Sequence, residues 1–228
     1  MEKIIKKIIL FFVVSCIHTC YLQANNFYAS GPQNIKKISL TFDDGPGENT
    51  LKILEILKKK KVKATFFMLG CNIKNNSKII KKVFDDGHEI ANHTYKHINF
   101  YNYNKENKIT IIENEILSTE KVIKDILNIK TFLVRFPYGY SKQDAIKIAK
   151  KYNYHVINWT FGIDWKQMDI NKIHDEYKRA IKNGSIFLMH DVSKNNNVLM
   201  FLEKFIDEII ESGYKIVTIS ELLSLKNV

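Results

Sequence analysis

Two kinds of apolar pattern alternate along this chain of 228 residues. Short, continuous apolar runs are typical of buried strands, whereas longer stretches with an apolar residue every three or four positions indicate amphipathic helices. The short runs predict strands at residues 37–42, 64–69, 89–92, 131–134, 155–159, 185–189 and 214–218. The longer stretches predict helices at about residues 51–57, 77–84, 108–127, 143–151, 170–181 and 198–211, with a short final helix after residue 220.

Capping residues and glycines support these bounds. Asn49 or Thr50 is expected to cap the first helix, and Ser77, Asp169 and Ser220 stand where later helices begin. Glycines at 87, 184 and 213 stand just beyond helix ends, where a left-handed residue often terminates a helix.

The regular alternation of strands and helices predicts an α/β fold built from parallel βα units. Either an open doubly wound sheet or a closed barrel satisfies this pattern. No repeat or internal linker interrupts the pattern, and the length suits one domain with a sizeable core. The sequence therefore predicts a single domain over residues 37–228.

The first 24 residues predict a leader rather than part of the fold. A basic start at residues 1–7 precedes an apolar run at 8–14 that is too short to span a membrane, as in a secretory signal. Cleavage after Ala24 is one expected fate, acylation at Cys16 in a lipobox-like sequence is a second, and an uncleaved anchor is a third. We expect an extracytoplasmic protein, with residues 25–36 as a polar tether.

The chain carries a net charge of +11, but its lysines are scattered along it. Their one run, at residues 58–61, ends a predicted helix, where positive charge complements the helix dipole. No zinc-finger or RNA-binding signature accompanies the charge. We therefore expect no nucleic-acid partner, and membrane contact only through the leader or a lipid anchor; the oligomeric state is left open.

Side chains that can bind a metal ion, transfer a proton or bind a substrate follow five of the predicted strands. In parallel βα folds the carboxyl ends of the strands meet at one face, where sites are built. Any one of these clusters alone would be an ordinary turn or cap, but together they predict one shared pocket. The clusters are Asp43-Asp44, the segment 93–97, the segment 135–139, Asp164-Trp165 and His190-Asp191.

The spacing of His93 and His97 predicts a metal site. If the segment is helical, residues four apart lie on one face and can grip one ion. One carboxylate from Asp43-Asp44 would complete a set of two histidines and one carboxylate, which leaves a coordination position open, as in catalytic zinc sites. Such an ion polarises a carbonyl and lowers the pKa of bound water to about 7, which suits hydrolysis.

The second aspartate is then free to act as a general base. Arg135 could pair with it through both guanidinium nitrogens. His190 can protonate a leaving amine, with Asp164 orienting its ring.

The residues around these groups predict a small apolar pocket. Its expected walls are Tyr138, Trp165 and Leu188. A backbone N–H after Pro137 could stabilise a developing oxyanion.

Four stretches of this sequence resemble the motifs of the polysaccharide deacetylases (carbohydrate esterase family 4), and most of all peptidoglycan N-acetylglucosamine deacetylases. The resemblance covers about residues 37–223. The motifs stand here as Thr41-Phe42-Asp43-Asp44-Gly45-Pro46, His93-Thr94-Tyr95-Lys96-His97 preceded by Gly87-His88-Glu89-Ile90-Ala91-Asn92, Arg135-Phe136-Pro137-Tyr138-Gly139, and Leu188-Met189-His190-Asp191.

The resemblance implies a distorted (β/α)7 barrel and gives each candidate a role. It makes Asp43 the base, held by Arg135, and His190 the acid. Asp44, His93 and His97 become ligands of zinc, with other divalent ions such as cobalt as alternatives. The family often has an aspartate three residues before the Asp-Trp pair, where this chain has Phe161, and we expect this residue to change the shape of a sugar subsite.

The expected activity is metal-dependent hydrolysis of the N-acetyl group of N-acetylglucosamine in a cell-wall or extracellular polysaccharide, with release of acetate. Peptidoglycan is the favoured polymer because the leader suggests a bacterial envelope protein. Muramic acid, a chitooligosaccharide or an exopolysaccharide is an alternative substrate. A catalytically silent barrel that binds glycans is the rival from another class.

Overall fold

The computed structural model describes residues 26–192 and 196–226, so the expected leader lies outside the described residues. Within them, the strands are β1 (Phe27–Tyr28), β2 (Lys37–Asp43), β3 (Thr65–Met68), β4 (Glu89–Asn92), β5 (Leu133–Val134), β6 (His155–Ile157), β7 (Ile186–His190) and β8 (Lys215–Ile216). The helices are α2 (Glu48–Lys60), α3 (Gly70–Asn75), α4 (Ser77–Asp85), α5 (Lys108–Leu127), α6 (Gln143–Lys151), α7 (Ile170–Arg179), α8 (Asn197–Glu211) and α9 (Ile219–Leu223), with a 3₁₀ turn at Pro137–Gly139. In this part of the chain, no helix has the length and apolar character needed to cross a membrane.

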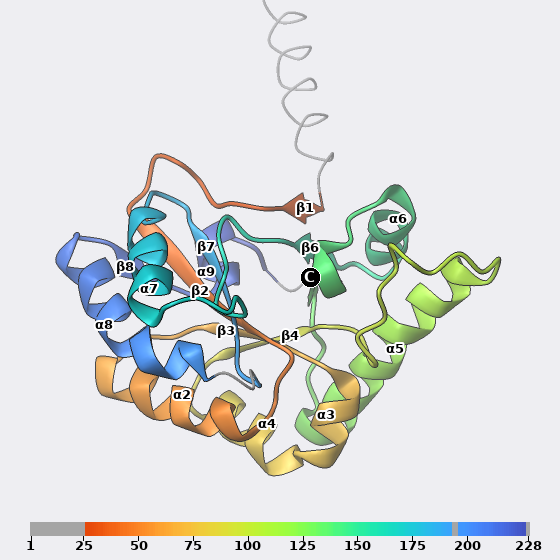
Figure 1. Cartoon of the computed structure of the whole chain (residues 1–228). Helices are drawn as coiled ribbons and strands as arrows, with labels where there is room; N and C mark the ends of the chain where they lie inside the picture. The colour runs from red at the N-terminus through yellow and green to blue at the C-terminus, as the bar shows by residue number, and fades with distance from the viewer. Residues whose placement is uncertain (1–25, 193–195, 227–228) are drawn as a thin grey trace, which may run out of the picture.

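The strands form one parallel sheet that curls into a distorted barrel, as the family resemblance implies (Figure 1). The order across the sheet is β1-β6-β5-β4-β3-β2-β7, and β8 pairs with the start of β2. The barrel closes where the chain beyond β6 meets β7: Phe161 bridges Phe187, and Leu188 donates its N–H to the Phe161 carbonyl at 2.8 Å. Every strand pair is parallel, so the carboxyl ends of the strands meet at one face.

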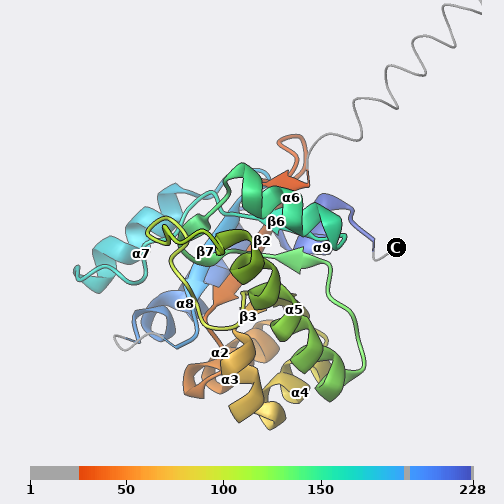
Figure 2. The ribbon, with the colours of Figure 1, turned by 90° about the vertical axis from the view of Figure 1, so that its right-hand side faces the viewer.

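The helices surround the sheet, each packing against the next in the order α7, α8, α2, α4, α5 and α6 (Figures 1 and 2). Strand β2 is central to the fold, since Ile38, Leu40 and Phe42 are fully buried under the α2 and α8 side. The Phe42 and Phe66 rings stack 5.0 Å apart between neighbouring strands β2 and β3. Burying large apolar side chains on this scale provides most of the free energy that holds the helices on the sheet.

Several expected bounds hold, among them the helix at Lys108–Leu127 and the strand at Glu89–Asn92. Other expectations need correction. Gly47, and neither Asn49 nor Thr50, is the N-cap of α2, and the Thr50 hydroxyl accepts the Gly47 N–H at 2.8 Å. Helix α3, after β3, was not expected from the sequence. Its six residues are too few to show a helical apolar period.

The segment 25–36 is not a free tether in its described part. Phe27 and Tyr28 form β1, which pairs in parallel with β6. Val156 and Asn158 donate their N–H groups to the carbonyls of Asn26 and Tyr28, at 2.6 and 2.7 Å. Strand β6 would otherwise leave an unpaired edge there, so this short strand satisfies hydrogen bonds that local sequence does not reveal.

Candidate active site

One pocket of about 480 Å³ opens at the carboxyl ends of the strands and contains a residue from each of the five predicted clusters. Arg135 and Asp164 are fully buried behind its wall. Trp159 and Val192 also line the pocket and were not among the candidates. Trp159 ends a predicted strand, which was the one sequence signal that could have found it. The lining residues are Asp43, Asp44, His93, His97, Tyr138, Trp159, Trp165, Leu188, His190 and Val192.

Adjacent aspartates reach the same pocket because the chain turns between them. Asp43 is the last residue of β2, whereas Asp44 has a left-handed φ of 76°. The turn is tight: a side chain at Gly45 would collide with the buried carboxyl group of Asp191. Glycine is therefore required next to the second aspartate.

Asp44, His93 and His97 form a group that could hold a metal ion, with their ligand atoms within 4.8 Å of one another. Asp44 Oδ1 lies 3.2 Å from His97 Nε2 and 3.4 Å from His93 Nε2. Tetrahedral zinc with bonds of about 2.0 to 2.1 Å separates its ligand atoms by about 3.3 to 3.4 Å. Asp44 Oδ1 is also buried and has no hydrogen-bond donor in the described chain. The donor set and the two separations from Asp44 Oδ1 therefore suit a divalent cation.

The ring of His93 is oriented from behind. Its Nδ1 lies 2.7 Å from the Arg135 carbonyl, an acceptor that holds the Nδ1 proton, so Nε2 faces Asp44 and the pocket as the nitrogen that can bind a cation. Burial alone would raise the pKa of Asp44, but its close contact with His93 and the positive charges that His93, His97 and His190 carry when protonated lower it to about 2. Asp44 is thus a carboxylate at any physiological pH.

The two histidines do not reach the site from a helix, which corrects the sequence expectation. Residues 93–97 form a loop in which Thr94 and His97 have left-handed φ values of 68° and 57°. Residues other than glycine rarely adopt this backbone conformation, so the surrounding contacts must hold the loop in place.

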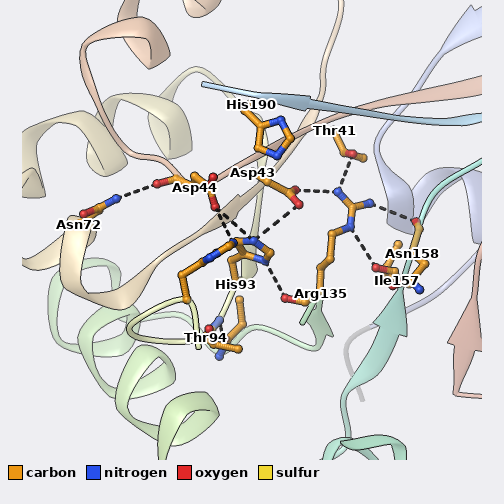
Figure 3. A network of polar contacts seen from close by, with 12 residues as sticks. Thr41, Asp43, Asp44, Asn72, His93, Thr94, Arg135, Ile157, Asn158 and His190 are labelled. Atoms are coloured by element: carbon orange, nitrogen blue, oxygen red, sulfur yellow. Dashed lines mark hydrogen bonds and ion pairs between the residues drawn. The ribbon is translucent and has the colours of Figure 1, made fainter. Parts of the chain in front are cut away.

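Arg135 contacts Asp43 through one nitrogen, not two. Its Nη1 donates to Asp43 Oδ1 at 2.7 Å and to the Thr41 hydroxyl at 2.8 Å (Figure 3). Its Nε and Nη2 donate to the carbonyls of Ile157 and Asn158, at 3.0 and 3.1 Å. Because the fork is divided among these partners, the expected bidentate pair does not form. Oδ2 of Asp43 is left facing the pocket, 3.7 Å from His93 Nε2.

His190 and Asp164 form a second charged pair across the pocket. Asp164 Oδ1 lies 3.0 Å from Nδ1 of the His190 ring, and Asp164 Oδ2 accepts the backbone N–H of His190 at 2.8 Å. Burial by itself lowers the pKa of His190, but the hydrogen bond and charge of Asp164, with the charges of Asp43 and Asp44, raise it to about 9. In Figure 3 the rings of His190 and His93 lie on either side of the two aspartates.

The expected apolar wall is present. Leu188 is buried at the base, and the exposed rings of Tyr138 and Trp165 contact His97 and His190, with centroids 5.0 and 5.3 Å apart. Phe161, by contrast, does not line the pocket. Its partly buried ring packs edge-on against Tyr177 at 5.1 Å, beside the hydrophobic core, so an effect of Phe161 on a sugar subsite stays a prediction.

Comparison with known sequences gives a consistent result. The family model for polysaccharide deacetylases matches residues 30–157. A peptidoglycan-N-acetylglucosamine deacetylase of Bacillus cereus is 34% identical over 201 residues, covering 86% of this chain and 92% of that protein. The peptidoglycan-N-acetylglucosamine deacetylase PgdA of Listeria monocytogenes is 31% identical, but the match spans only 40% of its length.

Solved structures resemble the whole described fold. The Bc1960 peptidoglycan N-acetylglucosamine deacetylase superposes with a TM-score of 0.83 at 30% identity, covering 90% of this chain and 96% of that one. A family 4 carbohydrate esterase pseudoenzyme from Bacillus anthracis, BA3943, superposes with a TM-score of 0.79 at 33% identity, covering 89% of this chain and 70% of that one. Similarity of fold alone therefore does not distinguish an active member from a silent one.

Proposed function

Because this chain belongs to the polysaccharide deacetylase family, we propose that it hydrolyses the N-acetyl group of N-acetylglucosamine residues in peptidoglycan and releases acetate. One observation supports this most: the Asp44, His93 and His97 triad shares its pocket with Asp43 and His190. A ligand set, a base and an acid in one pocket are what amide hydrolysis requires.

In this proposal Asp44, His93 and His97 hold a divalent cation, and we favour zinc because two imidazoles and one carboxylate match its preference. Bound there, zinc supplies a Lewis acid for the acetyl carbonyl and makes water more acidic. Asp44, ionised by its surroundings, brings negative charge to the cation.

Asp43 is the proposed base, and Oδ2 is the atom that takes the proton of the attacking water. Oδ1 is engaged by Arg135, whose position is fixed by the carbonyls of Ile157 and Asn158. The geometry of this contact keeps Oδ2 aimed into the pocket. A preset orientation of this kind removes part of the entropic cost of reaching the transition state.

His190 is the proposed acid. Asp164 holds its Nδ1, so Nε2 is the nitrogen that can deliver a proton to the amine nitrogen of the sugar as the amide C–N bond breaks. With a pKa raised to about 9, the ring is protonated at neutral pH. Asp43 thus removes a proton from the attacking water, and His190 delivers a proton to the leaving amine.

The remaining residues are proposed to bind the substrate. Tyr138 and Trp165 offer exposed ring faces to the sugar, and Leu188 forms an apolar base suited to the acetyl methyl group. Among the backbone hydrogen bonds of the described chain, none uses the Tyr138 N–H as donor, so this group can serve the developing oxyanion.

We further propose that the protein acts outside the cytoplasm, with residues 1–24 as a signal or lipoprotein leader and residues 37–228 as the catalytic domain. Two relatives are named as peptidoglycan deacetylases, and peptidoglycan is an extracytoplasmic polymer. Any membrane contact would come through the leader or through acylation at Cys16.

A silent, glycan-binding barrel is the second candidate, because a pseudoenzyme of this family has nearly the same fold. The two candidates differ in one measurement. The full chain is loaded with zinc and incubated with peptidoglycan, chitooligosaccharides and muramic acid-containing fragments, and free acetate is measured. We expect acetate from peptidoglycan and none with Asp43→Asn. Binding of these glycans without any acetate would favour the silent barrel.

A further inference from the structure

Glu115, in the middle of α5, is a buried carboxylate that directly contacts the loop of residues 93–97. Only 7% of its surface is exposed. Its Oε2 accepts two backbone N–H groups, from Tyr95 at 2.9 Å and from Lys96 at 2.7 Å. A carboxylate bonded to backbone amides forms strong, charge-assisted hydrogen bonds, and glutamate is seldom buried without such partners.

The rest of the loop is held by groups from β4 and α3. Asn92 Oδ1 accepts the Thr94 N–H at 2.8 Å. The first two N–H groups of α3, from Gly70 and Cys71, donate to the carbonyls of Thr94 and Tyr95 at 3.0 and 3.1 Å. Glu115 is therefore the partner that satisfies the two N–H groups immediately before His97.

His97 depends on this backbone more than His93 does. The Nδ1 of His93 is fixed by the Arg135 carbonyl, whereas no hydrogen bond is recorded for Nδ1 of His97 within residues 26–192 and 196–226. His97 also has a left-handed φ of 57°, a conformation that its neighbours must impose. The place of its Nε2, 3.2 Å from Asp44 Oδ1, thus follows from where Lys96 is held.

We propose that Glu115 is a positioning residue for the metal site: by accepting the N–H groups of Tyr95 and Lys96 it fixes the loop that presents His97. This inference rests on the proposed metal triad. Glu115 itself does not line the pocket, and its hydrogen bonds to the loop go to backbone N–H groups and to none of the three ligand side chains. Its effect is therefore expected on metal affinity, through the loop.

Zinc binding to the full, metal-free chain tests this, measured by competition with a chromophoric chelator. Residues that only hold a metal ligand typically change metal affinity by about 10- to 100-fold when removed, and we expect E115A to raise the zinc Kd by this factor. We also expect faster amide hydrogen exchange at Tyr95 and Lys96 in the metal-free E115A chain. A folded E115A chain with unchanged zinc affinity would overturn the inference.

A pair of milder variants separates reach from charge and does not depend on E115A folding. Both N–H groups go to one oxygen, so E115Q keeps an acceptor at the right reach, while E115D keeps the charge on a side chain one methylene shorter. We expect E115D to weaken zinc binding more than E115Q does. The opposite order would mean that charge alone matters, and would overturn the inference.

Glu89 provides the matched control. It is also a poorly exposed glutamate, but it lies at the start of β4, at the end away from the loop of residues 93–97. There it accepts hydrogen bonds from the Thr65 hydroxyl at 2.7 Å and from the Ser220 N–H at 3.3 Å. E89A should lower the melting temperature and leave the zinc Kd unchanged. An equal loss of zinc affinity in E89A and E115A would mean that zinc binding only follows the stability of the fold, and would overturn the inference. A wild-type chain that binds no zinc would instead overturn the metal triad, and this inference with it.

Discussion

Asp43 and His190 are register partners across the parallel strands β2 and β7, so the proposed base and the proposed acid stand at the same level of the barrel. Partners in register on neighbouring strands point to the same face of a sheet. Each is held by a separate buried partner, Asp43 by Arg135 and His190 by Asp164. The strand pairing thus sets the positions of two opposite chemical functions, and the predictions below test them one by one.

Asp43→Asn should abolish turnover and leave metal affinity nearly unchanged. The amide has the size of the carboxylate but cannot take a proton from water, and loss of a general base typically costs about 10²- to 10⁴-fold in rate. Acetate release gives the rate and chelator competition gives the zinc Kd. An active Asp43→Asn variant would show that another group is the base.

His93→Ala should lose the metal itself. Because residues that merely hold a ligand change affinity by about 10- to 100-fold, removal of a ligand should exceed about 100-fold in zinc Kd. His155→Ala is the control, since His155 lies at the start of β6 and outside the pocket. Chelator treatment of the wild type should abolish acetate release, and added zinc should restore it. Full activity after complete removal of zinc would contradict a metal-dependent reaction.

The His190 ring should titrate at about pH 9 in the metal-free chain, as measured by NMR of the imidazole. Asp164→Asn removes the charge and hydrogen bond that raise this pKa, so the titration should move toward the ordinary value of 6.5. A raised histidine pKa means that folding favours the protonated ring. Its contribution to stability is therefore complete below pH 6.5 and is lost as the pH rises through 9. A titration in Asp164→Asn identical to that of the wild type would remove Asp164 as the cause.

Arg135→Met should destabilise the protein strongly. The change removes the Arg135 donor from Asp43, from the Thr41 hydroxyl, and from the buried Ile157 and partly buried Asn158 carbonyls. Removing one partner of a buried ion pair typically costs about 3 to 5 kcal/mol in the free energy of unfolding. Lys121→Met is the control, because its ion pair with Asp125 is exposed and should change that free energy by less than about 1 kcal/mol. Urea unfolding measures both, and equal effects would mean that the Arg135 network adds little.

Local patterns in the sequence could predict the α/β order and the place of the site, whereas the choice of a barrel over an open sheet came from the resemblance to the family. Apolar runs and amphipathic periods gave the strands and helices, and parallel connections bring the carboxyl ends of the strands to one face. The five polar clusters therefore had to meet, and each supplies a residue to one pocket. Even Glu115 left a trace, since it falls on the buried face of α5 between Ile112 and Ile116.

Contacts between distant residues decided the rest. Local sequence alone could not show that Phe161 packs edge-on against Tyr177, or that the Arg135 guanidinium divides its donors. Residues 93–97 would lie on a helix if the two histidines shared a helical face, but they form a loop, with left-handed φ values at Thr94 and His97, that is held by Glu115 and the start of α3.

The order of elements and the kinds of side chain at the strand ends were thus determined by the sequence, through periodicity and chain connectivity. Which oxygen accepts, which nitrogen donates and which backbone amides hold a metal-ligating histidine were decided only by the tertiary structure. The physical reason is that these hydrogen bonds join residues far apart in the chain, and their geometry depends on the packing of whole elements.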